Sequence, residues 1–355
     1  MRVLAVLGED AERAAAGLVR MFRAEGHAVT SARLSREEEA PGDFVPAIGG
    51  LLPNPCFWTE WATGRAGGVD PGADITVLAV PDPGSAASRL SGAELRLASS
   101  VPLWLDGFGR PSCVEPPLLP LNGLCIGICG DERHHRVTYP AVLATLGDAA
   151  DRMGWPVELV FLSAAGMLAR ELPAGLHGVI LPGGSDMAEV EAQIAAARAA
   201  RAAGLPVLGL CLGMQSMATM VLRDAGDPGA VLEEVAGPGP GRSFVRLSDA
   251  GAPWHRLGER ILCPLPGTQL AAVLTEGATI RMNHRYRLEP KAVPGLTLHT
   301  SAEQGITDAI ELPGHPFFIG LQGHPELGCD PALDRLWDAF LEAAETYHLS
   351  WTEVA

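Results

Sequence analysis

The sequence contains very little lysine and no excess of basic residues. Lys291 is the single lysine in 355 residues, and 26 basic side chains stand against 42 acidic ones, which gives a formal net charge of −16. Proteins that bind nucleic acid or anionic membranes usually carry a basic face. The charge balance therefore argues against both classes, while a local pocket for a carboxylate or phosphate remains compatible with it.

Long apolar runs are also absent. No run of about 18 consecutive apolar residues occurs, so we expect no membrane span. The apolar run at the amino terminus is short and has no basic segment before it, unlike a secretory signal peptide. The seven cysteines are scattered through apolar segments, which is typical of a reduced, cytoplasmic protein.

Clustered metal ligands and a phosphate-binding loop are missing as well. Cys125 and Cys129 lie in one expected strand without the neighbouring ligands that a zinc site needs, so core packing explains them better than a metal. No G-x-x-x-x-G-K-[ST] sequence occurs anywhere. We expect neither a metal ion nor a cofactor.

What is present predicts two α/β domains, residues 1–120 and 121–355. The boundary is expected near residues 111–122, where four prolines interrupt any helical period. The first domain should contain strands at 3–7, 28–32, 75–80 and 102–105, and helices at 11–24 and 86–98. The second should contain strands at 124–129, 157–162, 179–181 and 207–210, and helices at 140–153, 190–203 and 214–222. Strands alternating with helices predict a mostly parallel sheet with helices on both faces.

Cys211 occupies a position that is typical of a catalytic nucleophile. An apolar strand runs into it, Gly209 and Gly213 flank it, and a helix-compatible run follows. This is the layout of a nucleophile elbow. A thiolate at a helix amino terminus is favoured by the helix dipole, and the N–H of Leu212 would point toward a developing oxyanion. A buried core cysteine is the alternative interpretation of this motif alone.

Two further segments favour the catalytic interpretation. Pro182-Gly183-Gly184 follows a strand and leaves backbone N–H groups uncovered at the carboxyl edge of the sheet. A second strand delivers His324, with Glu326 two residues later. A cysteine nucleophile needs a base, and the imidazole needs an orienting acceptor. The three segments together predict thiol-dependent acyl transfer.

This combination resembles the class I glutamine amidotransferases, and most closely the glutaminase domain of CTP synthase. The resemblance covers residues from about 124 to 345. The matching segments are the region around Tyr139, the Pro182-Gly183-Gly184 turn, residues 211–215, Asn283-His284-Arg285-Tyr286 and residues 310–318. The last two segments separate CTP synthase-like domains from other amidotransferases. It implies a flavodoxin-like class I amidotransferase fold preceded by a smaller amino-terminal α/β domain.

The resemblance also implies a role for each matched residue. Cys211 would attack the side-chain carbonyl of glutamine, His324 would act as base and then acid, and Glu326 would orient His324. Backbone N–H groups would hold the oxyanion, from Gly183, Gly184 and Leu212. The glutamine would be contacted by Gln215, Arg285 and Tyr286, and its α-amino group by Glu234, with Glu233 as the rival. Solvated surface positions are the alternative for Arg285, His284 and Gln215.

The chain also departs from that family. It has no recognisable synthetase domain, Ser185 stands where an aromatic residue is frequent, and Gly323 precedes the histidine where a larger apolar residue is usual. The first hypothesis is a glutaminase that supplies ammonia to an unknown acceptor, a nucleotide or a partner synthetase, in a nucleoside-related pathway. The second is a stand-alone hydrolase of γ-glutamyl compounds, whose pocket the small Ser185 and Gly323 would enlarge. The third is a non-catalytic binding or regulatory module. A homo-oligomer is left open.

Overall fold

The computed structural model describes residues 2–33, 73–80, 93–116, 123–137, 139–169, 172–184, 186–247, 255–275, 277–290, 292–301, 305–327 and 330–352. The chain divides into two compact units, one formed by residues 1–119 with 135–148 and the other by residues 120–134 with 149–355. None of the described helices is long and apolar enough to cross a bilayer.

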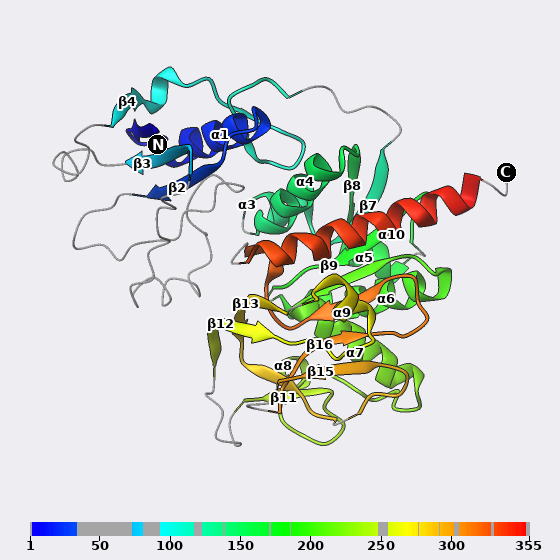
Figure 1. The fold of residues 1–355 in the computed structure, drawn as a ribbon. Helices are drawn as coiled ribbons and strands as arrows, with labels where there is room; N and C mark the ends of the chain where they lie inside the picture. The colour runs from blue at the N-terminus through cyan, green and yellow to red at the C-terminus, as the bar shows by residue number, and fades with distance from the viewer. Residues whose placement is uncertain are drawn as a thin grey trace. The chain divides into compact units, whose positions relative to one another are not determined.

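The first unit is built around a four-stranded parallel sheet in the order β2-β3-β1-β4 (Figure 1). Its elements are β1 (Arg2–Leu7), α1 (Ala11–Ala24), β2 (Val29–Arg33), β3 (Ile75–Val80), β4 (Glu94–Leu97), the 3₁₀ helix η5 (Ala98–Ser100), β5 (Trp104–Leu105) and β6 (Pro111–Ser112). Helices α3 (Glu132–Val137) and α4 (Ala141–Met153) begin later in the chain and contribute residues 135–148 to this unit.

Helix α1 covers this sheet with a face of small and apolar residues. Ala11, Ala15, Leu18 and Phe22 recur at helical spacing and are all buried. The helix ends where Gly26 adopts a φ of 87°, and the N–H groups of residues 26 and 27 bond to the carbonyls of Arg23 and Phe22. This is a Schellman ending, and it explains why the helix stops where the sequence predicts.

The predicted helix at 86–98 is wrong in its described part. Residues Glu94–Leu97 form strand β4, which pairs in parallel with β1. The alternation of polar and apolar residues in this segment suits a strand, and the open edge of β1 supplies backbone hydrogen bonds that an isolated helix cannot match. The strand predicted at 102–105 is confirmed only at Trp104–Leu105, and residues 86–92 lie outside the described ranges.

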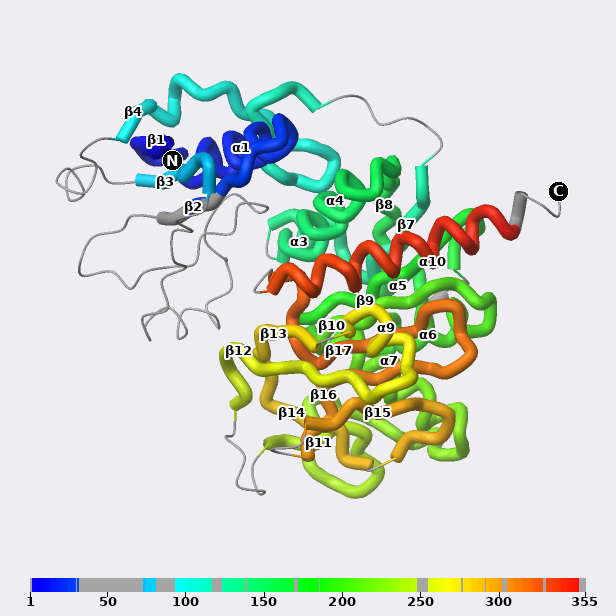
Figure 2. Tube along the Cα trace, in the orientation of Figure 1, coloured from blue at the N-terminus to red at the C-terminus, as the bar shows by residue number. Residues whose placement is uncertain are grey.

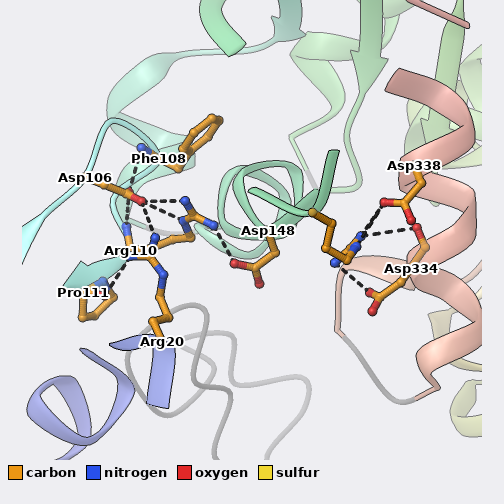
Figure 3. Close-up of polar contacts among 9 residues, drawn as sticks. Arg20, Asp106, Phe108, Arg110, Pro111, Asp148, Asp334 and Asp338 are labelled. Atoms are coloured by element: carbon orange, nitrogen blue, oxygen red, sulfur yellow. Dashed lines mark hydrogen bonds and ion pairs between the residues drawn. The ribbon is translucent and has the colours of Figure 1, made fainter. Parts of the chain in front are cut away.

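A buried arginine organises the end of the first unit. Arg110 donates to a carboxylate oxygen of Asp106 at 2.8 Å and to one of Asp148 on α4 at 2.6 Å (Figure 3). A Cβ added at Gly147 would lie 2.7 Å from both the Arg110 guanidinium and the Phe108 ring, so the helix needs a glycine there. The arrangement fixes α4 against the loop between β5 and β6, because a buried guanidinium must keep its partners.

The second unit contains a seven-stranded sheet in the order β15-β16-β17-β10-β9-β7-β8. Its elements are β7 (Leu124–Cys129), β8 (Val157–Leu162), α5 (Ala164–Ala169), β9 (Gly178–Leu181), η6 (Met187–Glu189), α6 (Val190–Ala203), β10 (Val207–Leu210), α7 (Leu212–Asp224), α8 (Glu233–Ala236), β11 (Phe244–Arg246), β12 (Arg256–Leu262), α9 (Gln269–Val273), β13 (Ala278–His284), β14 (Tyr286–Leu288), β15 (Thr297–Thr300), β16 (Thr307–Glu311), β17 (Phe318–Leu321), η7 (Pro325–Leu327), η8 (Pro331–Leu333) and α10 (Asp334–Thr352).

Strands β8, β7, β9, β10 and β17 are parallel, whereas β16 and β15 add an antiparallel edge. Val179 and Leu181 of β9 belong to the apolar cluster shared with α6 and α7, while Gly178 lies against Phe340 of α10. Successive strand residues point to opposite faces, so α6 and α7 cover one face and α10 the other. Figure 2 shows β9, β10 and β17 grouped at the centre of this unit. The predicted mostly parallel sheet with helices on both faces is confirmed.

Candidate active site

The turn that carries Cys211 joins the central strand β10 to helix α7. The N–H of Cys211 donates to the carbonyl of Leu321 on β17 at 2.7 Å, and its own carbonyl accepts from Gln215 N at 3.1 Å. Cys211 has φ 48° and ψ −102°, and it is the one non-glycine residue at positive φ in the described part of the chain. Such a conformation costs on the order of 1–3 kcal/mol and persists where the surroundings impose it.

Two glycines allow the elbow to pack so tightly. A Cβ added at Gly213 would lie 1.9 Å from the carbonyl oxygen of Leu181, and one at Gly209 would lie 2.2 Å from the sulfur of Met217. Neither position can hold a side chain without movement of backbone or core. The glycines that marked the motif in the sequence therefore have a steric reason, and they bring α7 directly against the end of β9.

His324 and Glu326 follow β17, the strand next to β10. The Nδ1 of His324 lies 2.7 Å from a carboxylate oxygen of Glu326, and the histidine N–H of the main chain donates to the carbonyl of Arg281 at 2.8 Å. Nδ1 of His324 faces Glu326, so the hydrogen bond between His324 and the Cys211 side chain must involve the other ring nitrogen, Nε2. The sequence prediction that these three side chains converge agrees with this geometry.

The charge state of His324 depends on its neighbours. Burial alone would lower the pKa of His324, but the negative charges of Glu326 and of the Cys211 thiolate, together with hydrogen bonds to both, raise that pKa well above its ordinary value. The raised pKa favours a protonated His324 imidazole beside the Cys211 sulfur. A thiolate is the nucleophilic form of cysteine.

The Gly183 turn and the first residue of α7 both adjoin Cys211. A Cβ added at Gly183 would be 3.0 Å from Cε1 of His324 and 3.2 Å from Cβ of Cys211, so the Pro182-Gly183 turn lies against both side chains. Leu212 is the first residue of α7, where N–H groups have no partner within the helix. Gly184 continues the turn, and no atom of the described residues lies within 4 Å of its added Cβ. Ser185 lies outside the described residues.

Two buried glutamines, Gln215 and Gln322, lie close to the Cys211 side chain. Gln322, which the sequence analysis did not single out, donates from Nε2 to the sulfur of Cys211 at 3.8 Å and accepts from Gln215 Nε2 at 3.5 Å. Gln215 is 3% exposed, so the alternative of a surface position is wrong for it. Its side-chain oxygen has no hydrogen-bond partner although it is buried. A buried unsatisfied acceptor costs about 1–3 kcal/mol, which makes it a candidate contact for a ligand N–H group.

Two of the predicted glutamine-binding residues, Glu234 and Tyr286, interact with Arg246. Glu234 has a carboxyl whose pKa is raised by burial, against the lowering effect of the positive charges of Arg246 and Arg285. Arg246 donates to the hydroxyl of Tyr286 at 3.1 Å and lies over its ring. Glu233 instead accepts the backbone N–H of Arg246 at 3.2 Å. Arg246 is a further residue that sequence reasoning missed.

The segment that carries Arg285 and Tyr286 rests on a buried polar network. His284 lies between Arg256 and the carbonyl of Tyr286, at 3.3 and 2.7 Å. Burial and the charge of Arg256 lower the pKa of His284 to about 3. The solvated basic patch is therefore wrong for His284, which is 4% exposed, whereas Arg285 is exposed. Arg256 also pairs with Asp308 on β16, which ties this segment to the central sheet.

Gly323 does not enlarge the site. A Cβ added there would lie 2.7 Å from Cγ1 of Ile280 and 2.9 Å from the carbonyl of Arg281. The position is small because strand β13 packs on it, and not because space is left for a larger substrate. Within the described ranges, no group of three or more His, Cys, Asp or Glu side chains is placed to hold a metal ion.

A thiol at a strand-to-helix turn, an imidazole paired with a carboxylate, and uncovered backbone N–H groups can together transfer an acyl group through a thioester. A flavodoxin-like α/β unit that presents these groups at the carboxyl ends of its strands is the architecture of a class I amidotransferase. The family model for class I glutamine amidotransferases matches residues 157–343, and the chain belongs to this family.

Individual relatives agree with the family. The chain is 30% identical over 238 residues to CTP synthase of Chlamydia pneumoniae, a match that covers 62% of this chain and 44% of that protein. It is 29% identical over 257 residues to CTP synthase of Acidobacterium capsulatum, covering 68% of this chain and 47% of the relative. The chain thus spans about half the length of these relatives.

A solved structure shows the same fold. The glutaminase domain of Trypanosoma brucei CTPS with bound acivicin superimposes with a TM-score of 0.56 at 23% identity, covering 63% of this chain and 94% of that one. This chain also contains the additional amino-terminal unit described above.

Proposed function

We propose that this protein hydrolyses the side-chain amide of glutamine with Cys211, His324 and Glu326, and delivers ammonia to an acceptor. The observation that carries the proposal is the strained position of Cys211, whose side chain shares a hydrogen bond with the His324–Glu326 pair and lies against the Gly183 turn. Strain retained at a reactive side chain is a mark of function.

The steps follow from the contacts. The Cys211 thiolate attacks the amide carbon, and the oxyanion accepts hydrogen bonds from backbone N–H groups of the Gly183-Gly184 turn and of Leu212. The His324 imidazolium then gives its proton to the leaving nitrogen, so that ammonia departs and a γ-glutamyl thioester remains. A water molecule loses a proton to His324 and attacks the thioester, which releases glutamate and restores the thiolate. Glu326 holds His324 in the required orientation.

Substrate binding is assigned to the charged group described above. Arg285 suits the α-carboxylate of glutamine, because a guanidinium binds a carboxylate in bidentate fashion. Glu234 is assigned to the α-amino group in preference to Glu233, whose carboxylate already accepts the Arg246 backbone N–H. Gln215 and Tyr286 complete the pocket, with Arg246 as a second cation near Glu234.

We further propose that residues 121–355 form the amidotransferase domain and that residues 1–120 bind the acceptor or dock a synthetase partner. The relatives are named CTP synthases, which supports a nucleotide or nucleoside-related acceptor. A γ-glutamyl hydrolase with an enlarged pocket has no support from Gly323, since Ile280 fills that space. Cytoplasmic location and a homo-oligomeric state stay predictions.

The test is glutamate release from glutamine by the purified chain, with and without nucleoside triphosphates. Cys211→Ala should reduce release at least about 10³-fold while leaving the thermal midpoint within a few degrees, because removal of one member of such a set removes most of its catalysis. Cys263→Ala is the matched control, since Cys263 is an exposed free cysteine and should retain full activity.

Other outcomes would count against the proposal. Residual release above about one per cent in Cys211→Ala would exclude this nucleophile. Hydrolysis of larger γ-glutamyl amides in preference to glutamine would favour the stand-alone hydrolase. A wild-type protein that neither releases glutamate nor reacts at Cys211 with a glutamine-like electrophile would indicate a binding module. Stimulation by one nucleotide would identify the class of acceptor.

A further inference from the structure

Helix α6 contains a glutamine that is buried among alanine and aliphatic residues. Gln193 is 2% exposed, on a face otherwise made of Val190, Ala192, Ile194, Ala196, Ala197 and Ala200. A buried amide costs free energy unless both of its ends are hydrogen-bonded. An apolar residue could fill this position without that cost. The presence of a glutamine therefore has to be explained by its hydrogen bonds.

Both ends of the Gln193 amide are satisfied, and by two different elements. Nε2 donates to the carbonyl oxygen of Pro182 at 3.0 Å, and Oε1 accepts from the hydroxyl of Ser216 at 2.9 Å. A carbonyl oxygen can only accept, so the NH₂ group must face Pro182 and the oxygen must face Ser216. Ser216 is completely buried in α7, one turn after Leu212.

The Pro182 carbonyl belongs to the peptide unit that bears the Gly183 N–H. A trans peptide is planar, and its C=O and N–H point in opposite directions. An anchor on the Pro182 oxygen therefore fixes the direction of the Gly183 N–H, at the turn that lies against Cys211 and His324. The other end of the same amide holds α7, whose first residue carries the Leu212 N–H.

We infer that Gln193 is a positioning residue that fixes the two halves of the oxyanion-binding site, the Gly183 turn and the first turn of α7, relative to each other. The inference rests on the proposed function, since it takes the Gly183 and Leu212 N–H groups as the oxyanion donors. Gln193 does not touch the substrate. It acts through the Pro182 peptide and through Ser216.

The test compares two reactions of the same sulfur. Acylation of Cys211 by p-nitrophenyl acetate passes through an oxyanion, whereas alkylation by iodoacetamide displaces iodide at a saturated carbon and forms none. Both rates are corrected with Cys211→Ala. In Gln193→Met the acylation rate and kcat for glutamine should fall about 10- to 100-fold, less than the loss expected when an oxyanion donor is removed outright. The alkylation rate and KM should change less than about threefold, because the thiolate and the glutamine contacts stay in place.

Two further variants keep the result interpretable. Ser216→Ala removes only the helix side of the link and should lower the ratio of acylation to alkylation by a smaller factor. Gln269→Met is the matched control, because Gln269 also donates to a proline carbonyl, that of Pro316 at 2.7 Å, but contacts neither half of the site. Its ratio should equal that of wild type.

An unchanged ratio in both Gln193→Met and Ser216→Ala would overturn the inference. Acylation and alkylation that fall together would also overturn it, since the glutamine would then support the elbow as a whole. A wild-type protein without Cys211-dependent glutamine hydrolysis would refute the proposed function. The ratio measured with p-nitrophenyl acetate would still decide the role of Gln193, because that ester needs no glutamine pocket.

Discussion

The turn after β1 in the first unit and the turn after β10 in the second share a backbone hydrogen bond and a positive φ, but a glycine takes this position in the first and a cysteine in the second. The N–H of Gly8 donates to the carbonyl of Val80 at the end of the neighbouring strand, and the N–H of Cys211 donates likewise to Leu321. Both residues lie at positive φ, 116° and 48°, and each turn leads into a helix.

The fold requires a residue at positive φ after each of these strands, but it does not require a side chain there. A glycine meets the backbone requirement of such a turn without strain, and among the described residues only Ala98 comes within 4 Å of a Cβ added at Gly8. At Cys211 the chain retains a side chain in a conformation that favours glycine. The neighbouring Gly183 turn, His324 and Gln322 hold that side chain in place. The second turn is therefore interpreted as a site and the first as a connection.

The largest expected effect is the loss of activity when His324, which distinguishes the second turn from the first, is replaced. His324→Asn should lower kcat for glutamine on the order of 10³-fold, because it removes the group that moves the proton. It should also slow iodoacetamide at neutral pH, since the imidazolium that stabilises the thiolate is lost. His27→Asn, at an exposed histidine of the first unit, is the control for both rates. Retention of a tenth of wild-type kcat in His324→Asn would contradict the assignment.

A second prediction measures the strain in the two turns directly. Gly8→Ala should lower the free energy of unfolding by about 1–3 kcal/mol, because the turn imposes a positive φ that a residue with a Cβ rarely adopts. Cys211→Gly should be more stable than Cys211→Ala by about 1 kcal/mol, because glycine adopts the positive φ at this position without the strain that alanine keeps. Urea unfolding of the four proteins, with wild type included, gives both differences. Equal stabilities of the two Cys211 variants would show that the elbow is not strained.

A third prediction concerns the acid stability of the second unit. Because the folded state lowers the pKa of His284 to about 3, the unfolded chain binds a proton that the folded chain does not between the ordinary value of 6.5 and about 3. The free energy of unfolding should therefore decrease as pH falls through this window, by up to about 1.4 kcal/mol per pH unit from this group.

His284→Gln isolates that term, because an amide can accept from Arg256 and donate to the Tyr286 carbonyl. Below pH 6.5, the slope of the free energy of unfolding against pH should be smaller in the variant, by up to the amount that corresponds to the uptake of one proton on unfolding. His324 acts in the opposite direction and above 6.5, since its pKa is raised, so it does not confuse the comparison. Identical slopes in wild type and His284→Gln would refute the prediction.

Local signals account for the parts of the fold that the sequence predicted well. Helices α1 and α6 have the predicted bounds, since each carries an apolar face and ends at a glycine with positive φ, Gly26 or Gly204. Strand β7 also has its predicted bounds, because a short apolar run suits a strand that is buried in a parallel sheet. Segment 94–97 was mispredicted because its structure depends on the edge of β1, about 90 residues away in the chain.

The residues of the candidate site also fall into two groups, those that sequence pattern reveals and those that it does not. Cys211, Gly183, His324 and Glu326 could be found from the sequence, because tight turns need glycines and a paired base needs its carboxylate close by. Gln193, Arg246 and Gln322 could not, since each looks like an ordinary polar residue in its own helix or strand. Only the packing of α6 on α7, of β17 on β10 and of β11 beside β14 decides which carbonyl, sulfur or ring each side chain meets. Sequence pattern determined the chemistry that is available to this protein, and tertiary structure decided its geometry, because hydrogen bonds between distant segments exist only once the sheet has brought them together.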